Sequence, residues 1–124
     1  MKIDYAEAQA ACETYIRSLQ ASDVETLLAL FDDNASIEDP VGTALREGKS
    51  ALREFYSVAC EGVLSAALSG APRLAGNEVA FPFTVTAGTV GEELTINIID
   101  VFKFNEAGKV VSMRAFWGPN NIGS

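Results

Sequence analysis

The apolar residues of this chain change their spacing near residue 62, and this change limits the folds open to it. Before that point they recur every three or four residues, as on amphipathic helices. After it they alternate with polar residues, as in strands that bury one face. Helices followed by an antiparallel meander are typical of α+β domains, in which helices cover one face of a curved sheet. The chain length of 124 residues fits one such domain over residues 1–124.

Three helices are expected in the first half of the chain. The first covers residues 5–19, with Asp4 at its start. The second opens with a capping box at residues 22–25, in which Ser22 is the cap, and runs through Phe31. The third begins at Ser50. Strands are expected near residues 35–39, 63–69, 78–87, 93–104 and 109–117.

The segment LTINIIDVFKF, residues 94–104, places a carboxylate on an apolar strand face. Alternate side chains of a strand point the same way, so Asp100 lies between Ile98 and Phe102 on one face. No Lys or Arg of this strand shares that face, and a buried aspartate without a partner is costly. Burial raises the pKa of such an acid, and the neutral carboxyl is a hydrogen-bond donor.

Three more polar groups lie on apolar faces. Asp39 has the parity of Ile37, so it points inward near a pocket mouth, where it can stay ionised and act as a base; alternatively it starts a turn before a proline. Tyr15 and Tyr56 lie on the apolar sides of two helices, where core packing would also explain them. Two carboxyls in different environments can divide acid and base roles, and neutral Asp100 with Tyr15 can form an oxyanion hole.

The composition excludes several classes of function. The net charge of −8 disfavours nucleic acids and anionic membranes as partners, because both bind through Lys and Arg. The chain has no histidine, which removes the usual zinc ligand and the commonest general base, so no metal site is expected. Cys12 and Cys60 are expected to be buried thiols. No apolar run reaches the length of a membrane span and no export signal is apparent, so a cytoplasmic location is expected.

The segments FDDNASIEDPVG, REFY and IDVFKFNEAGKVVSMRAFWG resemble the bacterial Δ5-3-ketosteroid isomerases, of the nuclear transport factor 2-like or SnoaL-like superfamily. The similarity runs over nearly the whole chain. It implies a cone-shaped α+β barrel, three N-terminal helices on a curved, mostly antiparallel sheet, and a homodimer. It also implies a cofactor-free reaction that converts a 3-oxo-Δ5-steroid into its 3-oxo-Δ4 isomer.

The resemblance also assigns roles to residues. Asp39 would carry a proton from C4 to C6, while Tyr15 and protonated Asp100 would hold the C3 oxygen of the dienolate. Tyr56 would hydrogen-bond Tyr15, and Phe31 stands where some members have a further tyrosine. The raised pKa of the acid at the position of Asp100 is an established property of this family. The expected apolar pocket, which core packing would explain equally well, comprises Phe31, Phe55, Phe81, Phe83, Met113, Phe116 and Trp117.

Two other functions stay open, because one fold hosts many activities. An epoxide hydrolase or cyclase of the same superfamily would use paired aspartates with an arginine. No arginine has an inward parity here, since Arg114 points outward if Met113 and Ala115 point inward. A dimeric binder of hydrophobic ligands would need neither two unpaired carboxyls nor a buried tyrosine beside them.

Overall fold

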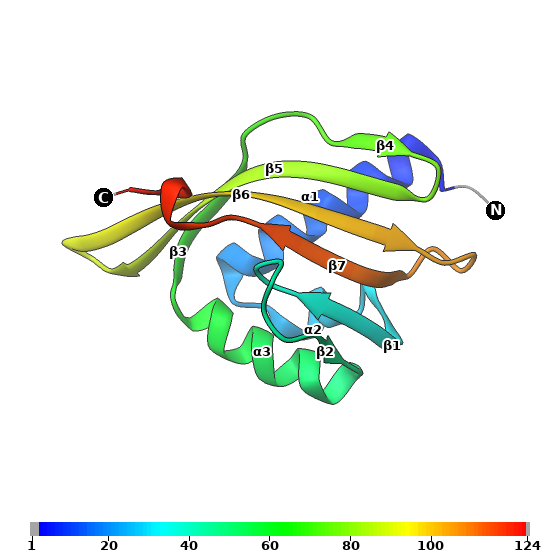
Figure 1. The fold of residues 1–124 in the computed structure, drawn as a ribbon, viewed down its shortest axis with the longest axis horizontal. Helices are drawn as coiled ribbons and strands as arrows, with labels where there is room; N and C mark the ends of the chain where they lie inside the picture. The colour runs from blue at the N-terminus through cyan, green and yellow to red at the C-terminus, as the bar shows by residue number, and fades with distance from the viewer. Residues whose placement is uncertain (1–2, 124) are drawn as a thin grey trace.

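In the computed structural model, which describes residues 3–123, three α-helices pack against one curved sheet (Figure 1). This confirms the α+β class and the helix-then-strand order. None of the helices within residues 3–123 is long and apolar enough to cross a membrane. The helices are α1 (Tyr5–Ala21), α2 (Val24–Leu28) and α3 (Lys49–Glu61), with a 3-10 turn at Pro119–Asn121. The strands are β1 (Phe31–Glu38), β2 (Arg46–Glu47), β3 (Val63–Leu68), β4 (Arg73–Ala75), β5 (Glu78–Thr89), β6 (Glu92–Phe104), β7 (Val110–Phe116) and β8 (Ile122–Gly123).

The sheet is mostly antiparallel, as expected. Its strand order is β2-β1-β7-β6-β5-β3, with β4 paired to β5 and β8 paired to β6. Among the named strands of residues 3–123, β1 and β7 form the one parallel pair. The long β5–β6 hairpin turns at Gly91, whose φ of 95° is open to glycine at little cost. Figure 1 shows this hairpin extending beyond the helices at one end of the molecule.

The core lies between the helices and the concave face of the sheet. Alternate residues of β5 are buried, as the period-two pattern predicts: Val79, Phe81, Phe83 and Val85. From α1, Tyr15 enters this core, and its ring centroid lies 5.1 Å from that of Phe102 in an edge-on contact. The ring of Tyr15 therefore packs against the sheet, while its hydroxyl meets that of Tyr56.

The prediction for the second helix is wrong at both ends. Ser22 is not its cap; this residue ends α1 in a left-handed conformation, and its hydroxyl donates to the Cys60 carbonyl at 3.0 Å. Asp23 is the cap, and its carboxylate accepts from the Thr26 N–H at 3.1 Å. The helix ends at Leu28, and Phe31 begins β1 because it pairs with Val110 of β7. Pairing in the sheet thus overrides the helical pattern.

Candidate active site

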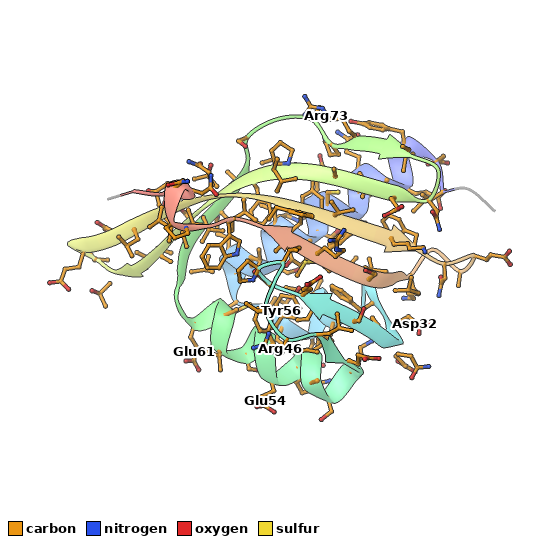
Figure 2. All side chains as sticks on the ribbon, viewed as in Figure 1. Asp32, Arg46, Glu54, Tyr56, Glu61 and Arg73 are labelled. Carbon is orange, nitrogen blue, oxygen red and sulfur yellow. The ribbon has the colours of Figure 1, made fainter. Side chains whose placement is uncertain are left out.

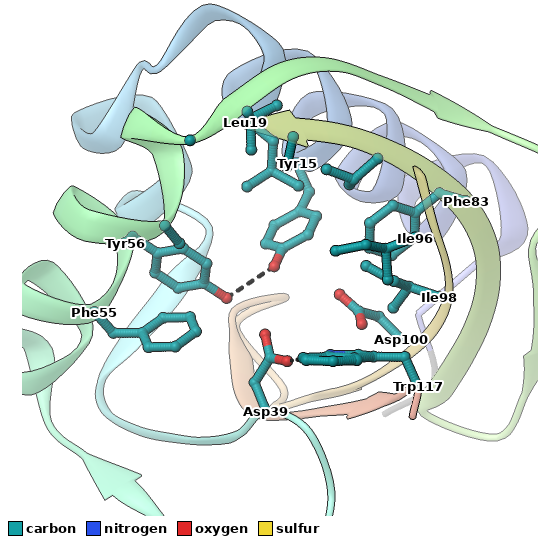
Figure 3. A pocket seen from close by; sticks show the side chains of 15 residues that line it. Tyr15, Leu19, Asp39, Phe55, Tyr56, Phe83, Ile96, Ile98, Asp100 and Trp117 are labelled. Carbon is teal, nitrogen blue, oxygen red and sulfur yellow. Dashed lines mark hydrogen bonds between the residues drawn. The ribbon is translucent and has the colours of Figure 1, made fainter. Parts of the chain in front are cut away.

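A cavity of about 250 Å³ opens between α1, α3 and the concave face of the sheet (Figure 3). This volume lies just below the range of about 300–1,000 Å³ that is usual for ligand pockets. Five of its lining residues carry polar groups on a mostly apolar wall, which is the usual composition of a small-molecule site. The polar members are Tyr15, Asp39, Tyr56, Asp100 and Trp117; the others are Leu19, Phe55, Ala59, Gly62, Val63, Phe83, Val85, Ala87, Ile96 and Ile98.

Two phenols from different helices meet at the inner end of the cavity. The hydroxyl oxygens of Tyr15 on α1 and Tyr56 on α3 lie 2.9 Å apart, so one hydroxyl donates to the other (Figure 3). Burial raises the pKa of both tyrosines well above the ordinary value, and both stay protonated at neutral pH. If Tyr56 donates to Tyr15, the Tyr15 proton is free to bind a ligand oxygen.

Asp100 lies where the strand pattern predicts, on the inward face of β6 and only 1% exposed. Its Oδ1 has no hydrogen-bond partner within residues 3–123. Burial raises its pKa well above the usual range, and the charge of Asp39 raises it further. The nearby Tyr15 hydroxyl acts in the opposite direction but does not offset burial. Asp100 is therefore a neutral acid whose O–H can be donated to a ligand in the cavity.

Asp39 follows β1, lines the same cavity and is half-buried. The Trp117 indole N–H donates to its Oδ1 at 2.8 Å, which orients the carboxyl (Figure 3). Burial raises the pKa of Asp39, whereas the Trp117 hydrogen bond and the charge of Arg46 lower it. Its side chain lines the cavity, so the alternative of a carboxyl that only starts a turn does not describe it.

The two acids share one cavity but differ in their hydrogen-bond partners and in the charges near them. Asp39 has an indole donor and an attractive cation, both of which favour its anion. Asp100 has neither, and the Asp39 charge works against its ionisation. Asp39 therefore ionises first as the pH rises. The arrangement can place a base on one side of a bound molecule and two neutral donors, Tyr15 and Asp100, on the other.

The structure places only some of the seven residues of the expected apolar pocket around the cavity. Phe55, Phe83 and Trp117 line the cavity. Phe31, Phe81 and Met113 do not line it; they are buried in the core, where Phe81 stacks on Phe83. Phe116 is 41% exposed and carries the Arg114 guanidinium on its ring. Met113 and Phe116 are three apart on β7, so they point to opposite faces of the sheet.

Eight lining residues were absent from the sequence prediction, and six of them share a strand or helix face with a predicted site residue. Ile96 and Ile98 share the face of Asp100, and Val85 and Ala87 share the face of Phe83. Leu19 is four residues after Tyr15 and Ala59 is three residues after Tyr56, so each shares a helix face with that tyrosine. Gly62 and Val63, at the junction of α3 and β3, had no such signal.

The positions of the arginines and of possible metal ligands complete the description of the site. No arginine lines the cavity among residues 3–123. Arg114 points outward, as its parity predicts, with its Nε 3.5 Å from Oε1 of Glu38. Within the same residues, no cluster of three or more Cys, Asp or Glu side chains is arranged to hold a metal ion.

Comparisons with known proteins agree on the family and divide on the reaction. A family model described as the SnoaL-like domain matches residues 12–113. The chain is 34% identical over 117 residues to a steroid Delta-isomerase of Nocardioides simplex, an alignment that covers 94% of both chains. It is also 32% identical over 110 residues to the epoxide hydrolase LasB of Streptomyces lasalocidi, covering 84% of this chain and 39% of that protein. The solved structure of SalBIII, described as an epoxide hydrolase/cyclase-like enzyme in pyran ring formation in the polyether salinomycin, matches with a TM-score of 0.87. That match has 31% identity and covers 97% of each chain.

Proposed function

The chain belongs to the SnoaL-like domain family, and from that premise we propose that it is a steroid Δ-isomerase, which converts 3-oxo-Δ5-steroids into 3-oxo-Δ4-steroids. One observation carries the proposal: a single cavity holds Tyr15, Asp100 and Asp39, with burial keeping Asp100 neutral and Trp117 orienting Asp39. The similarity to the steroid isomerase of Nocardioides simplex over nearly the whole chain supports it. A net charge of −8 is compatible with a neutral substrate.

The reaction begins with proton removal from carbon. The ionised Asp39 carboxylate takes the proton at C4, and the C–H electron pair forms the C3–C4 double bond as the carbonyl pair moves onto the C3 oxygen. The product is a dienolate. Tyr15 and protonated Asp100 donate hydrogen bonds to its oxygen, and these bonds strengthen as negative charge develops there.

The second step reverses the flow of electrons. The C3 carbonyl re-forms, the double bond moves to C4–C5, and C6 takes the proton from Asp39. Atoms and charge balance, because the same proton leaves and returns and Asp39 ends as a carboxylate. The reaction needs no oxidant and no added proton.

A second candidate is an epoxide hydrolase or cyclase, and the similarity to SalBIII over 97% of both chains favours it. In that reaction the neutral Asp100 gives its proton to an epoxide oxygen, and Asp39 accepts a proton from the attacking hydroxyl. The lack of an arginine in the lining of the described cavity weighs against this candidate. The two functions use the same acids, so they are distinguished by testing which substrate the protein turns over.

We also propose that the protein acts as a homodimer. The outer face of the sheet carries exposed apolar side chains, among them Ile99 at 47% and Phe116 at 41% exposed. Sedimentation equilibrium of the purified protein is expected to give twice the chain mass of 13.2 kDa. A monomer mass at micromolar concentration would contradict this assembly.

The deciding experiment offers both substrates to the purified protein. With 5-androstene-3,17-dione, the ultraviolet absorbance of the conjugated enone is expected to rise, and Asp39→Asn should lower kcat by about 10²–10⁴-fold, as for loss of a general base. A variant of an exposed acid outside the cavity, Glu93→Gln, should keep the wild-type rate. If no enone forms and an epoxide with a neighbouring hydroxyl is consumed instead, the second candidate is correct.

A further inference from the structure

Arg46 lies close to the cavity but does not line it. It belongs to β2, where it pairs with Ile37 of β1, and Asp39 is two residues further along that strand direction. Its guanidinium carbon lies 4.8 Å from the centroid of the Phe55 ring, within the range of a cation–π contact. Figure 2 labels Arg46 beside α3, the helix that carries Phe55. No ion pair holds Arg46 in the part of the chain that the structure describes.

Phe55 forms the wall between Arg46 and the active-site cavity. The ring lines that cavity together with Asp39 and Tyr56. It also lines a second hollow on the outer side, which is shared by Arg46, Ala51, Glu54, Val58 and Ala59. The cation is therefore separated from the cavity by an apolar ring, across which its charge is screened less than it would be across water.

We propose that Arg46 is a positioning residue for the isomerase reaction: its guanidinium, stacked on the outer face of Phe55, holds that wall in place and stabilises the Asp39 carboxylate. This inference rests on the proposed function only for its kinetic consequence. The interaction between Arg46 and Asp39 belongs to the pocket itself and can be measured without any substrate.

Among the groups of residues 3–123 around Asp39, Arg46 is the one that carries positive charge. Asp100 comes from β6, Tyr15 from α1 and Tyr56 from α3, and none of these carries positive charge. Trp117, after β7, contributes a neutral N–H. Burial raises the pKa of Asp39, the Trp117 bond lowers it, and the Arg46 charge lowers it further. Without Arg46 the base would hold its proton to a higher pH and would be less often ready to accept one from C4.

The test replaces the cation while keeping the stacked side chain. Arg46→Met leaves an unbranched apolar chain that can lie on the Phe55 ring, and Arg46→Lys keeps the charge. The matched control is Arg114→Met, since Arg114 also stacks on a phenylalanine, with 5.1 Å from guanidinium carbon to ring centroid, but lies on the outer face of the sheet. The first readout is the NMR titration of Asp39 in aspartate-labelled protein without ligand.

Arg46→Met is expected to titrate Asp39 at a higher pH than wild type, whereas Arg46→Lys and Arg114→Met should match wild type. High salt should reduce the difference between the wild-type midpoint and that of Arg46→Met, because it screens the charge of Arg46. In the steroid assay, kcat/KM of Arg46→Met should fall about three- to tenfold on the acid side of its pH profile, as for loss of one partly screened charge, and stay within about twofold on the plateau.

An Asp39 midpoint that is the same in Arg46→Met and wild type would overturn the inference. An equal shift in Arg114→Met would do so too, because the effect would then not be specific to Arg46. If the midpoint shifts as expected but wild type makes no enone, the proposed function fails and the role of Arg46 toward Asp39 stands. If wild type makes enone and the midpoint does not shift, only the inference about Arg46 fails.

Discussion

At the scale of single residues, Asp39 and Asp100 differ because one has polar neighbours and the other has almost none. Trp117 donates to Asp39 across 78 positions of sequence, whereas Oδ1 of Asp100 has no partner in residues 3–123. The inward position of Asp100 could be predicted from the sequence, because it follows from strand parity alone. The Trp117 bond could not, since it depends on how the end of β7 meets the loop after β1.

The free energy of unfolding is expected to depend on pH because Asp100 is buried and neutral. Its pKa is raised by folding, so its contribution to the free energy of unfolding is full below the unfolded value of about 3.9 and is lost as pH rises toward the folded pKa. The side chain in Asp100→Asn cannot ionise, so the stability of this variant does not fall with pH for this reason. Urea unfolding at pH 5 to 8 should show the variant gaining on wild type by up to about 1.4 kcal/mol per pH unit. A stability difference that is constant with pH would mean that Asp100 titrates normally.

The two tyrosines are expected to differ in importance although they share one hydrogen bond. Tyr15→Phe removes a donor to the oxyanion and should lower kcat about 10²–10³-fold. Tyr56→Phe removes only the hydrogen bond between the Tyr56 and Tyr15 hydroxyls, which lie 2.9 Å apart. It should therefore lower kcat much less than Tyr15→Phe does. Steady-state kinetics on 5-androstene-3,17-dione measure both. A larger loss for Tyr56→Phe would reverse their order in the network.

At the scale of elements, the sequence predicted best where the pattern is long and regular. The alternating pattern predicted the ends of β5 and β6 to within two residues. The helical pattern predicted the ends of the first helix equally well. The short α2 was predicted with the wrong cap and the wrong end, because a Ser-Asp pair offers two caps and a five-residue helix has too few residues to show a period. The two-residue strands β2 and β8 carry no pattern at all; only their partners define them.

The cap of α1 is expected to matter for stability and not for chemistry. Asp4 accepts from the Glu7 N–H at 2.8 Å, and Glu7 accepts in return from the Asp4 N–H at 3.3 Å. Asp4→Ala should lower the free energy of unfolding by about 0.5–2 kcal/mol, while Asp4→Asn, which keeps an acceptor, should lose much less. Because Tyr15 lies three turns further on, kcat should stay at the wild-type value in both. A fall in kcat for Asp4→Ala would show that the helix end positions Tyr15.

At the scale of the whole molecule, the fold explains how two carboxyls in one cavity come to differ. The curved sheet carries Asp100 on the inward face of β6, where it is buried, whereas Asp39 follows the end of β1 and is half-buried. The sequence could predict the class and order of this fold, but not the depth of each acid, because depth depends on the curvature of the sheet and on the aromatic packing behind the lining.

The proposed oxyanion hole depends above all on the protonation state of Asp100 at neutral pH. Carboxyl NMR of protein labelled at aspartate, with Asp100→Asn to assign the resonance, measures it from about pH 4 to pH 8. We predict that the Asp100 signal remains that of a neutral acid at pH 7, far above the ordinary aspartate pKa of about 3.9, while the Asp39 signal is that of an anion. An Asp100 signal that shows full ionisation by pH 6 would contradict the account, because an anion there would repel the dienolate that it is proposed to hold.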